Sequence, residues 1–181
     1  MNTPCIMKAS SSSWPCRFSS EVGSPADLEL RPIAPDDLPQ FVALCAEHAA
    51  FEQAAFFENG QADRLAVLLF GPRPAAYGLV VARGAELLGF ATYIPEFSTW
   101  DAAYYLHLDC LFLRPELRGR GVGRRVMAAV AAEARQLGCA LMQWQTPDFN
   151  HAAIAFYQRL GASRKSKVRF DLAAEQLMES N

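Results

Sequence analysis

The chain has 181 residues, of which 51% are hydrophobic and 20% charged, and its formal net charge is −2. This composition is typical of one globular domain that can bury a core, and it excludes the disordered class of proteins. The near-neutral charge argues against a general nucleic-acid binder, and no uncharged apolar run reaches the roughly 18 residues needed to cross a bilayer. We therefore expect neither a nucleic acid nor a membrane as partner.

Residues 1–26 are rich in serine and lack the apolar core that a secretory signal requires. We interpret them as a disordered or mobile leader, and residues 27–181 as a single domain. The five cysteines form no C-x-x-C pair and have no zinc-ligand spacing with the three histidines. The sequence therefore predicts a cytoplasmic protein with unpaired thiols and no metal site.

Hydrophobic periodicity and turn residues predict the secondary structure from residue 28 onward. A proline followed by two acidic residues marks the start of the first helix, and Arg83-Gly84 marks a hairpin turn between two strands. In chain order we expect a strand over 28–33, a helix from Pro35 to about residue 50, a helix over 61–70, strands over 77–82, 87–94 and 104–113, a helix over 122–137, a strand over 140–145, a helix over 150–160, a strand over 168–172 and a short helix over 173–178.

This order of elements predicts a mixed α/β fold with an antiparallel front and one parallel crossover. The crossover would run through the helix over residues 122–137. We expect a central, mostly antiparallel sheet of about six to seven strands, flanked by helices.

The most informative segment follows the strand that ends before Pro115. Arg118-Gly119-Arg120-Gly121-Val122-Gly123 opens directly into a helix that begins near Val122. Such a loop points backbone N–H groups at one place, where the positive end of the helix dipole also acts, and its glycines let an anion approach closely. The spacing is neither the dinucleotide fingerprint nor a Walker A loop. The segment predicts a phosphate site, and specifically a pyrophosphate site; the alternative is a glycine-rich turn among solvated arginines.

A second motif begins at Asn150 and continues through an alanine-rich turn to Tyr157, just before Leu160-Gly161-Ala162. Together the two motifs resemble the signatures of the GNAT superfamily of acyl-CoA N-acetyltransferases, and the resemblance covers about residues 28–172. Segments 47–52, 89–93 and 105–109 look like the spermidine/spermine N-acetyltransferase branch. That branch has a Glu-Asp pair in the strand before the loop, where this chain has Asp109-Cys110.

The resemblance implies the GNAT-like fold and acetyl-CoA as co-substrate, without a metal. The loop N–H groups would hold the pyrophosphate, and the amide-bearing pantetheine arm would pair with an open strand edge. If that strand separates from its neighbour, a free N–H could also polarise the thioester carbonyl. Asn150 could equally be a helix N-cap. The cofactor-binding residues implied are Leu111, Leu113, Arg118, Gly119, Arg120, Gly121, Val122, Gly123, Arg124 and Asn150.

Catalysis by such an enzyme requires an amine without its proton, although alkylamines are protonated at neutral pH. Asp109 is our first candidate for the proton acceptor and His107 our second, because positions i and i+2 of a strand face the same side. Tyr157 occupies the position where the family has the proton donor for the departing thiolate. The alternatives are that His107 is a packed side chain and that Tyr157 is a buried aromatic ring.

We expect acidic and aromatic residues to line the side of the site that binds the acceptor amine, namely Glu52, Tyr93 and Trp100. The alternative is that the acid is a solvated surface group and that the aromatic rings belong to the core. The resemblance thus implies an acetyl-CoA-dependent N-acetyltransferase that transfers acetyl directly to a primary amine of a small molecule such as a polyamine or amino acid. Two alternatives stay open: a non-catalytic acyl-CoA-binding sensor or scaffold, and a protein N-terminal or lysine acetyltransferase. Many relatives form pairs, so we also expect a homodimer.

Overall fold

A computed structural model describes residues 27–177 of the chain, so the predicted leader over 1–26 lies outside the described residues. No helix within 27–177 is both long enough and apolar enough to span a bilayer. In chain order the elements are β1 (Leu28–Pro32), η1 (Pro35–Asp37), α1 (Leu38–Phe51), α2 (Gln61–Phe70), β2 (Tyr77–Arg83), β3 (Glu86–Ser98), β4 (Ala103–Leu113), η2 (Pro115–Leu117), α3 (Val122–Gln136), β5 (Met142–Gln143), α4 (His151–Arg159) and η3 (Ala174–Leu177), where η marks a 3-10 turn.

One sheet in the order β1-β2-β3-β4-β5 forms the centre of the molecule. The first four strands are antiparallel, and β5 is parallel to β4 after the crossover through α3. The mixed, mostly antiparallel α/β fold is therefore confirmed. The expected six to seven strands were too many, because the sheet has five among residues 27–177.

The excess comes from the C-terminal part of the sequence. Residues 168–172 form no strand, and the strand expected over 140–145 is reduced to Met142–Gln143. An alternating pattern becomes a strand only where a neighbouring strand supplies hydrogen bonds. Within the described chain, residues 168–172 have no such neighbour.

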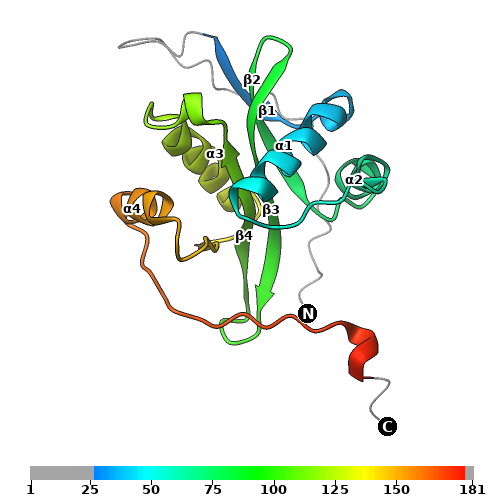
Figure 1. Cartoon of the computed structure of the whole chain (residues 1–181). Coiled ribbons are helices and arrows are strands. Elements are labelled where there is room, and N and C mark those ends of the chain that lie inside the picture. Colours follow the sequence, from blue (N-terminus) through cyan, green and yellow to red (C-terminus); the bar gives the residue numbers. More distant parts are fainter. Residues whose placement is uncertain (1–26, 178–181) are drawn as a thin grey trace.

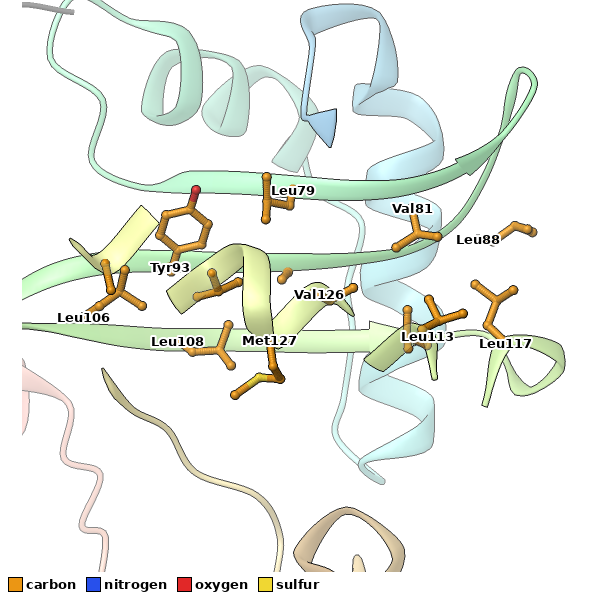
Figure 2. Close-up of a cluster of buried hydrophobic side chains, with 14 of the residues drawn as sticks. Leu79, Val81, Leu88, Tyr93, Leu106, Leu108, Leu113, Leu117, Val126 and Met127 are labelled. Atoms are coloured by element: carbon orange, nitrogen blue, oxygen red, sulfur yellow. The ribbon is translucent and has the colours of Figure 1, made fainter. Parts of the chain in front are cut away.

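Buried side chains form two clusters, one on each face of the sheet. Consecutive residues of β2 alternate between them, with Leu79 in the cluster beneath α3 and Val80 in the cluster beneath α1 and α2. Figure 2 shows the first cluster, in which Val126 and Met127 of α3 lie among side chains of β2, β3 and β4. In the second, the rings of Phe41 and Phe90 meet edge to face with centroids 4.9 Å apart. The sheet is thus covered by helices on both faces (Figure 1).

Asp37, at the start of α1, is only 7% exposed, and its carboxylate accepts three hydrogen bonds. The Arg31 guanidinium donates to its two oxygens at 2.6 and 2.8 Å, and the Ala34 N–H donates at 2.7 Å. The bonds from Arg31, aided by the one from Ala34, hold the pKa of this carboxyl below its usual value. The pair ties β1 to the first helix.

We expect Asp37→Asn to lower the free energy of unfolding by about 2–3 kcal/mol at pH 7, because a hydrogen bond to a charged group contributes about 1.5–3 kcal/mol. Since the folded pKa is lowered, this contribution is present above the unfolded pKa of about 4 and is lost as pH falls through the folded pKa. Urea unfolding at pH 7 and at acid pH measures it. Asp36→Asn, at the exposed neighbouring position, is the control. Equal stabilities of the two variants at pH 7 would contradict the prediction.

Candidate active site

The glycine loop leaves a set of backbone donors free at the start of α3. Gly119 and Gly121 have φ of 70° and 77°, the left-handed region that favours glycine. Gly121 is the N-cap of α3, and no side chain caps this helix. Among residues 27–177, the N–H groups from Gly119 to Arg124 donate to no acceptor. The residues present therefore fit a pyrophosphate, because these donors and the helix dipole converge on one place.

The edge of β4 that leads to this loop is uncovered. The ladder with β5 consists of Leu106↔Met142 and His107↔Gln143, whereas β4 continues to Leu113. The Arg114 N–H donates to Leu88 O at 2.9 Å, so by strand alternation the backbone groups of Leu111 and Leu113 point away from β3. β4 and β5 therefore separate beyond His107. The edge of β4 exposed in this way suits an amide-bearing chain laid along it.

The Arg118 side chain joins three elements at the start of the loop. Its Nε donates to the Leu113 carbonyl at 2.9 Å, and its guanidinium carbon lies 4.4 Å from the centre of the Phe51 ring. The loop is thereby attached to the end of β4 and to the end of α1. Sequence reasoning treated Arg118 as a charge near the anion and missed this contact with Phe51, for which the sequence carries no signal.

A β-bulge in β4 orients the candidate proton acceptors. Thr92 pairs with Cys110 and Tyr93 with Leu108, which leaves Asp109 as the extra residue. Leu108 belongs to the cluster beneath α3, while Cys110 packs with the cluster beneath α1. The alternation therefore shifts by one residue at Asp109.

As a result, His107, Asp109 and Cys110 all face the side of the sheet that α1 covers. The Thr92 hydroxyl donates to the Asp109 carboxylate at 3.4 Å, and the Cys110 thiol lies 3.6 Å from the same oxygen. Asp109 itself is exposed. The acid thus stands at the surface of the sheet where a solute can reach it.

The end of α1 and the middle of α4 carry two further candidates, Glu52 and Tyr157. Figure 1 shows the C-terminal end of α1 directed toward α4. Glu52, at this end, has its Oε1 3.3 Å from His48 Nε2. Burial, with a smaller contribution from the Glu52 charge, raises the pKa of Tyr157 to about 12. The Tyr157 ring packs 5.1 Å from both Trp144 and Phe156. The Tyr157 phenol is therefore protonated at neutral pH.

The family described as "Acetyltransferase (GNAT) family" has a model that matches residues 41–162, which is more than half of the chain and includes every feature above. The chain belongs to this family. It is therefore an N-acetyltransferase, and GNAT acetyltransferases use acetyl-CoA as co-substrate.

Named relatives point in the same direction. A thialysine N-epsilon-acetyltransferase of Caenorhabditis elegans is 29% identical over 131 residues, covering 72% of this chain and 80% of the relative. An L-ornithine N5-acetyltransferase of Arabidopsis thaliana is 32% identical over 74 residues, covering 41% and 32%. The crystal structure of an aminoglycoside acetyltransferase from an uncultured soil metagenomic sample superposes with a TM-score of 0.71 at 18% identity, covering 82% of this chain and 97% of that one. This last likeness shows the fold alone.

Three residues predicted for this GNAT site lie apart from the rest or are already engaged. Tyr93 is 2% exposed and faces α3, where its ring stacks on Tyr77 with centroids 5.9 Å apart. Trp100 is 97% exposed in the turn between β3 and β4. Asn150 caps α4 by accepting the Ala153 N–H at 3.1 Å. The loop lies at the end of β4, Arg118 connects it to Phe51 beside Glu52, and Asp109 lies on the α1 face of β4.

Two glycines that sequence reasoning did not single out for packing also shape the site. A Cβ on Gly89 would lie 2.7 Å from the Phe112 carbonyl oxygen, so only glycine lets β3 approach β4 at its open half. A Cβ on Gly123 would lie 3.2 Å from the Phe156 ring, which brings α4 close to the start of α3. Glycine within a strand pattern is a signal of close backbone approach, and it could have identified Gly89.

Proposed function

We propose that this enzyme transfers the acetyl group of acetyl-CoA directly to a primary amine of a small molecule such as a polyamine or an amino acid. One observation carries the proposal: the open edge of β4 leads from free N–H groups at the glycine loop along the strand that carries Asp109 and His107. The relatives named for thialysine, ornithine and D-amino acids support an amine acceptor of this size.

The donor side is assigned to the loop and the β4 edge. Acetyl-CoA, when bound, supplies a thioester whose acetyl group an amine can accept. The N–H groups from Gly119 to Arg124 bind its pyrophosphate, and the exposed Arg120 and Arg124 add positive charge. The backbone of Leu111 and the N–H of Leu113 pair with the pantetheine arm, which fixes the direction in which the thioester points; the Leu113 carbonyl already accepts from Arg118. Arg118 positions the loop through Leu113 and Phe51.

We assign the acceptor side to residues of three elements, namely β4, the end of α1 and α4. Glu52 attracts the cationic amine, and Asp109 or His107 takes its proton, directly or through water. Tyr157 gives a proton to the sulfur of the leaving thiolate. The placement of Tyr93 in the core and of Trp100 in a distant turn supports leaving both out of this assignment.

A cytoplasmic location and a homodimer belong to the same proposal. Cys45, Cys110 and Cys139 are free thiols in the described part of the chain, which suits a reducing compartment.

The proposal is tested by thiol release from acetyl-CoA with a panel of polyamines, basic amino acids and peptides with free N-termini. We expect turnover with a small amine and a loss of about 10²-fold in kcat/KM on Asp109→Asn, since a positioned acid or base contributes at least that factor. Asp63→Asn, exposed on α2, is the matched control and should retain full activity. Acetyl-CoA binding without turnover would support the sensor alternative, and turnover with peptides alone would support a protein acetyltransferase.

A further inference from the structure

The second half of α1 lies outside the buried core. The buried residues of this helix are in its first half, at Leu38, Phe41, Val42 and Leu44. Residues 45–51 are all half-buried or exposed, and the chain then continues through turns and irregular structure over 52–60 before α2 begins. The end of the helix, where Glu52 follows, therefore depends on a few side-chain contacts for its position.

Arg114, directly after β4, makes a two-pronged contact with this half of α1. Its Nε and Nη2 donate to the two carboxylate oxygens of Glu47 at 3.0 and 2.7 Å. Its Nη1 donates to Glu86 at the start of β3 at 2.9 Å, and its backbone N–H donates to Leu88 O. A bidentate pair of an arginine and a carboxylate fixes direction as well as distance, because both groups are planar. Arg114 is thus anchored to the sheet and holds α1 from there.

Two ring contacts accompany this ion pair at the end of α1. The His48 ring lies 5.4 Å from the Phe112 ring of β4, and the Arg118 guanidinium lies 4.4 Å from the centre of the Phe51 ring. Glu52 comes next in the chain and has its Oε1 3.3 Å from His48 Nε2. Ring contacts are less directional than a bidentate hydrogen-bonded pair. The ion pair therefore sets the direction of the helix end.

We propose that Arg114 is a positioning residue for the acceptor, which fixes through Glu47 the last two turns of α1 and the Glu52 that follows them. The inference rests on the proposed function, in which Glu52 attracts the cationic amine. The Arg114 guanidinium is engaged by Glu47 and Glu86, so it acts through the helix and not on the amine. Without the pair, the helix end would occupy several positions, and binding of the amine would have to select one of them. The loss would therefore appear as weaker amine binding and not as slower transfer.

Steady-state kinetics with spermidine and L-lysine as probe amines test this role. We expect Glu47→Ala to raise the KM for the amine by about 5-fold, the upper value for a partly exposed ion pair, and to leave kcat and the KM for acetyl-CoA unchanged. Arg114→Met should have the same effect, and the double variant should be no worse than either, because the two residues act as one unit. Glu86→Ala is the matched control, since it removes a carboxylate from the same guanidinium on β3 and not on α1, and its amine KM should equal that of the wild type.

Three kinetic results would overturn the proposal. The first is a wild-type KM for the amine in Glu47→Ala. The second is an equal rise in Glu86→Ala, which would show a general effect of lost charge. The third is a rise in the KM for acetyl-CoA in place of the KM for the amine, which would assign the ion pair to the donor side.

Amide hydrogen exchange of the full chain without any ligand separates this inference from the proposed function. We expect residues 45–52 to exchange about 5-fold faster in Glu47→Ala and in Arg114→Met than in the wild type, while residues 38–44 keep their rates. Glu86→Ala should exchange as the wild type does. Unchanged exchange over 45–52 in both variants would overturn the proposal. If the wild type turns over neither probe amine, the proposed function fails, and faster exchange in this segment would still support the role of Arg114 in holding α1.

Discussion

Replacing Tyr157 by phenylalanine is expected to lower kcat by about 10²-fold and to leave the KM for acetyl-CoA nearly unchanged. The ring would keep its packing against Trp144 and Phe156, whereas the proton that it can donate would be lost. Because burial and the Glu52 charge raise the pKa of Tyr157 to about 12, the phenol keeps its proton at neutral pH, and kcat should show no loss from its ionisation between pH 7 and about 9.

Steady-state kinetics of Tyr157→Phe and of Tyr77→Phe separate the loss of the donated proton from the loss of a tyrosine hydroxyl elsewhere in the protein. Tyr77 stacks on Tyr93 in the core and has no part in the proposed site, so Tyr77→Phe removes a hydroxyl without affecting transfer. An unchanged kcat in Tyr157→Phe would show that the tyrosine is a packing residue. It would also favour a protein that binds acyl-CoA without reacting it.

Substitution of Gly121 by valine is expected to weaken coenzyme A binding by at least about 10²-fold, which corresponds to about 2.7 kcal/mol. With φ at 77°, a residue with a Cβ is strained at this position, and no protein atom lies within 4 Å of where the Cβ would stand. The added atoms would therefore enter the space assigned to the pyrophosphate. They would also disturb the N–H groups that converge there.

Gly138→Val is a closely matched control for this loss. Gly138 follows α3 at its other end, has φ of 73°, and likewise has no atom within 4 Å of the place that a Cβ would occupy. The two variants should lose similar stability from backbone strain, roughly 1–2 kcal/mol. Calorimetric titration with coenzyme A should show normal binding for Gly138→Val and weak binding for Gly121→Val. Equal affinities in the two variants would remove the glycine loop from the proposed site.

Helices and the glycine loop were predictable because their signals are local. The helix over Gln61–Phe70 forms with the predicted bounds, and α3 begins at Val122 as expected from the glycines before it. A helix satisfies its hydrogen bonds within a few residues, so caps and periodicity describe it well. The family resemblance rested on two such local motifs, and the match over residues 41–162 confirms it.

Strand pairing was not predictable to the same extent. The bulge at Asp109 depends on the register between β3 and β4, and the contact of Arg118 with Phe51 joins residues 67 positions apart in the sequence. The hydrophobic periodicity of a segment does not indicate which distant residues it pairs with or contacts. The same reason explains why residues 168–172 were expected in the sheet and are absent from it.

By itself, the sequence determined the helices, the α/β class, the glycine loop before α3 and the family, since each follows from residues that are neighbours along the chain. Only the tertiary structure decided that β4 parts from β5 beyond His107, that Asp109 turns toward α1, and that Tyr93 belongs to the core. These features arise from pairing and packing between distant segments, and their energies depend on partners that a linear pattern does not specify.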